Sequence, residues 1–185
     1  MKNLVKLLGI IALMAIIGFS FTACDNGSGV DDGSVNVEGV AFMYNGALYT
    51  GGAIASLEGF VGEFDHFEAE PTNSIGIVGS VSADNKLTLN LPADIADSKL
   101  INFGDIKYGV LSVKSDDYLV DDFGGTVLIT KGSNQALLMY SNQDITLSGY
   151  SAKKGWNYLT PGSYTGAIDA LITDLTGWTY DIVEW

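Results

Sequence analysis

From Val35 onward, apolar residues alternate with polar ones at a period of two, and this pattern limits the possible folds more than any other feature of the chain. A period of two places successive side chains on opposite faces of a strand, whereas an amphipathic helix needs a period near 3.6. Asn45-Gly46 separates the first alternating run from Ala47-Leu48-Tyr49. Because both turn residues tolerate positive φ, an Asn-Gly pair between apolar runs favours a tight β-hairpin.

Similar short runs recur along the rest of the chain, separated by turns rich in Gly, Pro, Asn and Ser. The further strand candidates are Ile54–Val61, Phe64–Glu70, Ile75–Val81, Lys86–Leu91, Ile106–Val113, Thr126–Lys131, Gln135–Ser141, Ile145–Tyr150, Gly155–Thr160, Tyr164–Ile168 and Trp178–Trp185. Helix is expected only in Ala93–Leu100 and Ala167–Leu175, as at most one or two short helices. The sequence predicts an all-β fold, an antiparallel β-sandwich of about 10–12 short strands.

The N-terminus carries a different pattern. Met1–Lys6 is basic, and Leu7–Phe21 is uncharged but shorter than the about 20 residues of a membrane span, as in a signal peptide. Phe21-Thr22-Ala23-Cys24 resembles a lipobox, the site at which bacterial lipoprotein signal peptides are cut before a cysteine. Leucine is usual at the first position, and the looser Phe21 resembles the lipoboxes of spirochaete lipoproteins. An uncleaved membrane anchor and a soluble secreted protein remain as alternatives.

The lipobox resemblance implies that Cys24, the only cysteine, carries acyl chains of the palmitate type and attaches the protein to a membrane of the cell envelope, facing the periplasm or the cell surface. Two or more acyl chains suffice for stable anchoring. Asp25–Ser34 holds one apolar residue and is predicted to be a flexible tether. The expected organisation is a signal peptide over residues 1–23, a lipidated cysteine and tether over 24–34, and one β-sandwich domain over 35–185.

The charge balance excludes one class of partner. The chain has a formal net charge of −13, with 22 acidic residues against nine lysines and no arginine. Binding to nucleic acid requires basic groups that neutralise phosphates. We therefore expect no nucleic-acid partner.

The motifs of common hydrolases are absent from the sequence: no G-x-S-x-G occurs, and His66 is the only histidine. We expect no enzymatic activity and no cofactor. Asp116-Asp117 and Asp121-Asp122 are the exception of interest, because carboxylates on adjoining turns can bind Ca²⁺ or, as a pair, hydrolyse glycosidic bonds. An acidic solvated loop explains the same residues without a function.

Aromatic residues gather near the C-terminus, where Trp156, Tyr158, Trp178 and Tyr180 form two alternating pairs. Within each pair the two rings are predicted to share one strand face. Exposed rings on a β-sandwich can form a platform for a sugar, and the same residue types also pack at sheet edges. These four residues are candidate ligand-binding residues.

Two further segments, Gly79–Pro92 and Ala152–Asn157, resemble segments of uncharacterised spirochaete-type lipoproteins, and the first is also similar to part of the transthyretin-like or carboxypeptidase-regulatory-like sandwich. This resemblance implies a β-sandwich and no catalytic residue. We expect a lipid-anchored binding or structural module of the cell envelope, with a glycan or an envelope protein as partner. An envelope glycan hydrolase and a Ca²⁺-dependent adhesin are the alternatives.

Overall fold

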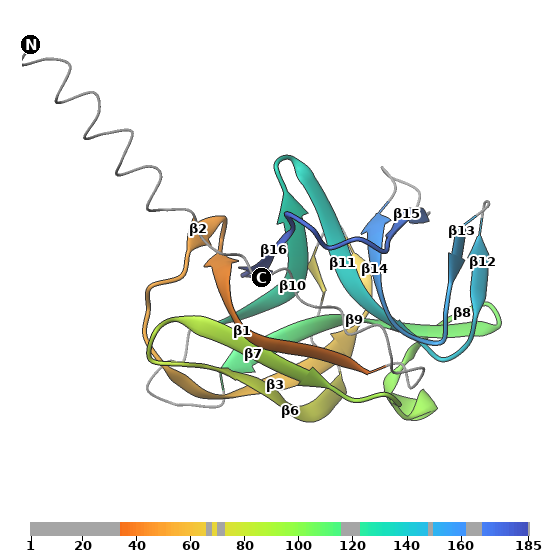
Figure 1. The fold of residues 1–185 in the computed structure, drawn as a ribbon. Helices are drawn as coiled ribbons and strands as arrows, with labels where there is room; N and C mark the ends of the chain where they lie inside the picture. The colour runs from red at the N-terminus through yellow and green to blue at the C-terminus, as the bar shows by residue number, and fades with distance from the viewer. Residues whose placement is uncertain are drawn as a thin grey trace, which may run out of the picture.

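The computed structural model describes residues 34–65, 68–69, 73–115, 123–147, 150–161 and 168–184. Within these residues the chain is all-β, as the alternating pattern predicts (Figure 1). The elements are β1 (Val35–Tyr44), β2 (Ala47–Leu48), β3 (Ile54–Gly62), β4 (Phe64–Asp65), β5 (Glu68–Ala69), β6 (Asn73–Val81), β7 (Lys86–Leu91), the 3₁₀ turn η1 (Asp97–Lys99), β8 (Ile101–Phe103), β9 (Ile106–Ser115), β10 (Gly124–Lys131), β11 (Asn134–Ser141), β12 (Ile145–Leu147), β13 (Tyr150–Ala152), β14 (Gly155–Pro161), β15 (Ile168–Ile172) and β16 (Thr179–Val183).

Three details differ from the prediction. The described residues form sixteen strand segments instead of 10–12, because pieces of two or three residues such as β2 and β8 pair beside the long strands. The helix expected in Ala167–Leu175 is wrong, since β15 pairs with β14 there. So short a helix is marginal by itself, and tertiary pairing decides the outcome. The sheet is also mixed, because β1 and β16 run parallel.

One large sheet curls until its strands meet again. Its order runs from β15 through β14, β11, β10, β16, β1, β7, β6 and β3 to β9, and β9 then also pairs with β10 and β11. At Gly125 a Cβ atom would lie 2.2 Å from the carbonyl oxygen of Val183, so the approach of β10 to β16 requires glycine. The closed part of the sheet therefore consists of β10, β16, β1, β7, β6, β3 and β9.

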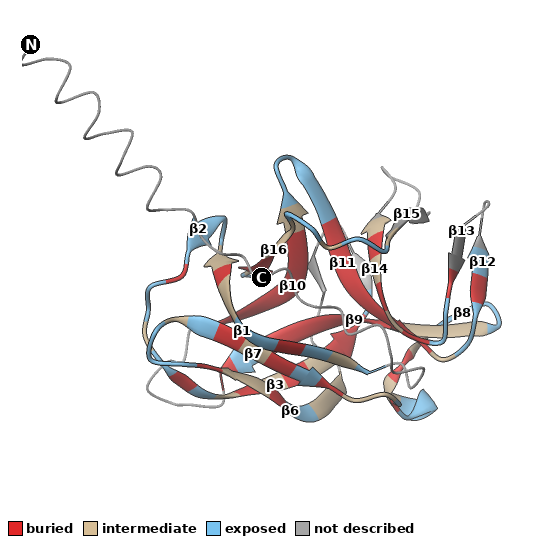
Figure 2. Ribbon diagram, viewed as in Figure 1, coloured by how far each residue is buried: buried red, intermediate tan, exposed pale blue. Residues whose placement is uncertain are grey.

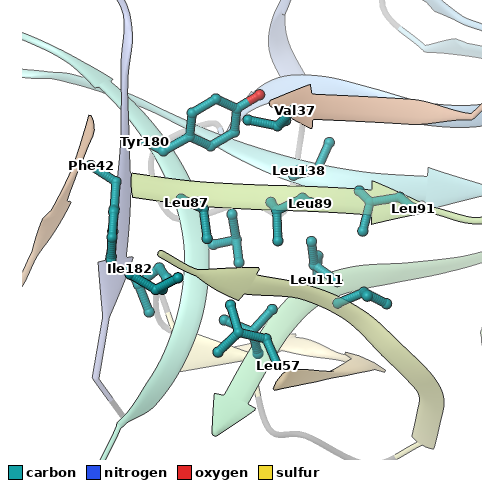
Figure 3. Packing of buried hydrophobic residues seen from close by; sticks show 14 of the residues in the cluster. Val37, Phe42, Leu57, Leu87, Leu89, Leu91, Leu111, Leu138, Tyr180 and Ile182 are labelled. Atoms are coloured by element: carbon teal, nitrogen blue, oxygen red, sulfur yellow. The ribbon is translucent and has the colours of Figure 1, made fainter. Parts of the chain in front are cut away.

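The closed sheet encloses the main hydrophobic core. Alternate residues of β7 point inward, and Leu87 and Leu89 are fully buried beside Phe42 and Leu138 (Figure 3). A second cluster lies on the other face of β9, β10 and β11, where Leu128 and other residues are covered by the β12–β13 hairpin. Strands β10 and β11 are therefore buried on both faces (Figure 2), which explains their continuous apolar runs.

The hairpin between β1 and β2 holds the C-terminal strand in place. The backbone N–H of Asn45 donates to the carbonyl of Ile182 at 3.1 Å. Asn45 also exchanges two hydrogen bonds with Glu184: its Nδ2 donates to Oε2 at 3.1 Å, and its Oδ1 accepts the Glu184 backbone N–H at 2.9 Å. Asn45 has a φ of 51° and Gly46 a φ of 74°, which fits the tight turn predicted from this pair.

Candidate functional site

The structure describes four of the predicted site residues. Trp156, Tyr158, Trp178 and Tyr180 all lie in the described part of the chain, whereas Cys24 and the acidic residues Asp116, Asp117, Asp121 and Asp122 lie outside it. The lipidation site and the acidic Ca²⁺ site therefore stay predictions. Within the described residues no helix has the length and apolar character needed to cross a bilayer.

The two aromatic pairs meet through Tyr158 and Tyr180, next to the short pairing of β16 with β1. Strand β16 pairs with β1 only at Phe42–Tyr44, and because β16 begins at Thr179 it does not accompany the first part of β1. The chain before β16 leads back to β15, which lies beyond β14 in the sheet order. Trp156 and Tyr158 lie on β14, Trp178 lies just before β16, and Tyr180 lies on β16.

Trp156 links β14 to the end of β7. Its indole Nε1–H donates to the carbonyl of Pro92 at 2.9 Å. Pro92 follows Leu91, the residue opposite Val35 in the pairing of β7 with β1. The Trp156 ring also lies edge-on to Tyr140, with centroids 5.4 Å apart. The indole is half-buried and held in a fixed orientation by these contacts.

Tyr158 and Tyr180 link β14 to β16. Their hydroxyl groups share a hydrogen bond, and their rings meet edge to face with centroids 6.4 Å apart. Tyr180 is buried and lies opposite Phe42 in the register of β16 with β1. Trp178, two residues earlier, packs against the main core and remains partly exposed. We call Trp156, Tyr158, Trp178 and Tyr180 the aromatic seam.

The loops beside Trp156 carry three ion pairs. Lys154 lies 2.7 Å from Asp94, Lys107 lies 2.9 Å from Asp97, and Lys153 lies 2.8 Å from Asp144. In each case the hydrogen bond from the lysine is the largest cause that lowers the pKa of the carboxyl group. A carboxyl group with a lowered pKa is ionised at neutral pH and is a poor proton donor.

Asp181 is a buried acid that sequence reasoning missed. It is 5% exposed, and its Oδ1 accepts the backbone N–H of Gly46 at 3.2 Å. Desolvation by burial raises its pKa, and the hydrogen bond from Gly46 acts in the opposite direction. The available signal is an acid inside the apolar strand Thr179–Val183, directly after the inward-facing Tyr180. Asp181 holds the hairpin against β16, so its observed role is structural.

The described residues offer ring surface in the seam and no metal-binding cluster. In the residues that the structure describes, no group of three or more His, Cys, Asp or Glu side chains is placed to hold a metal ion. The seam instead presents fixed, partly exposed apolar rings. Comparisons with known protein families, curated proteins and solved structures find no significant match. The case for a function therefore depends on the chain's own residues.

Proposed function

We propose that this chain is a lipid-anchored protein of the cell envelope whose folded domain is a non-enzymatic binding module. The anchor is supported by the uncharged segment Leu7–Phe21 and the lipobox-like Phe21–Cys24. The β domain begins at Val35, directly after the polar segment that the sequence predicts to be a tether. On this proposal Cys24 carries the lipid, and residues 25–34 separate the domain from the bilayer.

The observation that supports the binding role is that three of the seam rings are partly exposed and, for Trp156 and Tyr158, fixed by hydrogen bonds. Trp156, Tyr158 and Trp178 are each partly exposed. The indole N–H of Trp156 and the hydroxyl of Tyr158 already bond to protein atoms, so the exposed surface these two offer is mainly ring carbon. Rings that are already ordered lose little entropy on binding. Such a surface suits the apolar face of a sugar or the side chains of an envelope protein.

The carboxyl groups of the seam region support binding over glycan hydrolysis. A hydrolase needs one acid that is protonated at the working pH and a second acid about 5–9 Å away. Asp94 and Asp97 beside the seam have lowered pKa values because lysines bond to them. Asp181, whose pKa is raised, is bonded to the β1–β2 turn.

The anchor is tested by phase separation in a cloud-point detergent. The wild-type chain is expected in the detergent phase and in the membrane fraction, and Cys24→Ala is expected to lose the incorporation of labelled palmitate. Ser28→Ala, a small change in the tether, is the matched control and should behave as wild type. Palmitate labelling of Cys24→Ala at the wild-type level would refute the lipid anchor.

The binding role is tested on an array of bacterial and host glycans with the detergent-solubilised full chain. Binding that falls at least about tenfold in Trp178→Ala but stays unchanged in Phe103→Ala would make the seam a sugar-binding surface, a tenfold change being about 1.4 kcal/mol. Phe103 is a suitable control because it is 61% exposed and lies on the β8–β9 hairpin. A blank array would exclude glycans and leave a protein partner.

A further inference from the structure

Among the strands that the structure describes, none pairs with one edge of β1 along Val35–Ala41. Along Val35–Ala41, β1 pairs with β7 on one side. On the other side its described partner is β16, whose pairing covers only Phe42–Tyr44. Three residues of this part of the strand, Asn36, Glu38 and Gly39, are exposed to solvent. Backbone N–H and C=O groups along such an edge are available to an added strand.

The aromatic seam lies close to this part of β1. Tyr180 lies opposite Phe42, where the pairing with β16 begins, and Trp156 bonds to Pro92, which follows the β7 residue opposite Val35. Trp178 comes just before β16 and is partly exposed. An added strand would therefore find backbone partners on β1 and apolar rings for the side chains on its inner face.

Charge identifies the kind of strand that fits. Glu38 is exposed on the edge strand itself, and the chain as a whole has a net charge of −13. A second copy of this chain would place Glu38 near its own counterpart and add a second acidic surface, which like-charge repulsion disfavours. A segment with lysine or arginine beside its apolar residues meets the opposite charge.

We propose that the edge of β1 along Val35–Ala41 is a docking site for an extended, apolar and basic segment of a partner protein, which adds to the sheet as a strand. Main-chain hydrogen bonds to β1 hold this segment, and the aromatic seam contacts its alternate side chains. The site deepens the proposed function, because it names the partner of the binding module as a polypeptide.

The test begins with a phage-displayed library of random twelve-residue peptides, selected on the detergent-solubilised full chain. Enriched peptides are expected to alternate apolar residues with Lys or Arg. The best peptide is then made in two N-methylated forms, with the methyl groups on one or the other alternate set of amides. Strand addition uses only one set, so one form should bind at least about tenfold more weakly and the other about as well as the parent.

Hydrogen exchange on the protein locates the site. Without peptide, β1 amides that face away from β7 should exchange quickly, and the peptide should slow them by at least about tenfold. Trp178→Ala should weaken the binding of the peptide, and Phe103→Ala should leave it unchanged. Failure to enrich any peptide, equal effects of the two N-methylated forms, or full protection of residues 35–41 in the free chain would each overturn the proposal. Palmitate labelling of Cys24 is independent of all three results, so the anchor and the docking site fail separately.

Discussion

The two parts of β1, Val35–Ala41 and Phe42–Tyr44, differ in the strands that pair with them. At Phe42–Tyr44 the strand has β16 on one side and β2 on the other, and the turn that follows it exchanges hydrogen bonds with Glu184. Along Val35–Ala41 the strand has β7 on one side, and no described strand pairs with the other side, near which the aromatic seam lies. We call these the laddered half and the seam half of β1.

One part of β1 contributes to the packed core, and the other lies beside exposed side chains. Phe42 in the laddered half is fully buried and stacks on Tyr49 with ring centroids 4.8 Å apart, so this half belongs to the core. Beside the seam half three of the seam rings remain partly exposed, and one backbone edge has no partner among the described strands. The exposed ring surface on which the proposed binding role depends lies beside the seam half.

The largest expected effect comes from the laddered half. Phe42→Ala removes a fully buried ring from the main core, and we expect a loss of about 3–5 kcal/mol in the free energy of unfolding. Denaturant unfolding of the detergent-solubilised chain measures this loss.

Phe103→Ala is the control for that change. Phe103 is 61% exposed, so the same deletion should change the free energy of unfolding by no more than about 0.5 kcal/mol. Losses of equal size in the two variants would mean that Phe42 does not belong to a tightly packed core.

The fold follows from the sequence to a large extent because local patterns determine it. Alternation predicts β1 and β7 at their observed bounds, and Asn45-Gly46 predicts the first turn. The parallel pairing of β1 with β16 has no local signal, since it joins the two ends of the domain. The β15 strand was expected to be helical because apolar spacing over a short segment does not distinguish helix from edge strand.

The candidate site follows only in part. Alternation predicts that Trp156 and Tyr158 lie on one face of β14. This prediction agrees with the structure, in which both pack against the main core. The contact of Tyr158 with Tyr180 depends on the closure of the sheet, which brings β14 and β16 together through β10 and β11. Burial of Asp181 depends on the same closure. Neither is visible in the sequence, because each joins elements whose proximity is set by the whole topology.

A smaller effect is expected in the seam half. Trp156→Phe keeps an aromatic ring but removes the hydrogen bond to the Pro92 carbonyl, and we expect a loss of about 1 kcal/mol in the free energy of unfolding. Trp178→Phe makes the same change in ring size away from Pro92 and serves as the matched control. If the free energy of unfolding falls equally in the two variants, the loss comes from the smaller ring and not from the missing hydrogen bond.

The smallest effect is a change in pH dependence at the laddered half. Burial raises the pKa of Asp181, so the folded chain holds its proton more tightly than the unfolded chain does. Stability from this group is present at low pH and is lost as the pH rises from the ordinary aspartate pKa of about 3.9 through the raised value. Asp181→Asn keeps an oxygen for the Gly46 N–H and removes the titration.

Thermal unfolding of the wild type and of Asp181→Asn at a series of pH values isolates this contribution. Asp94, Asp97 and Asp144 have lowered pKa values, so their contributions are lost as the pH falls, and they are common to both proteins. The variant should therefore gain stability relative to the wild type as the pH rises above about 4. A difference between the two proteins that is constant with pH would mean that the pKa of Asp181 is not raised. Water would then reach its carboxyl group beneath the β1–β2 hairpin.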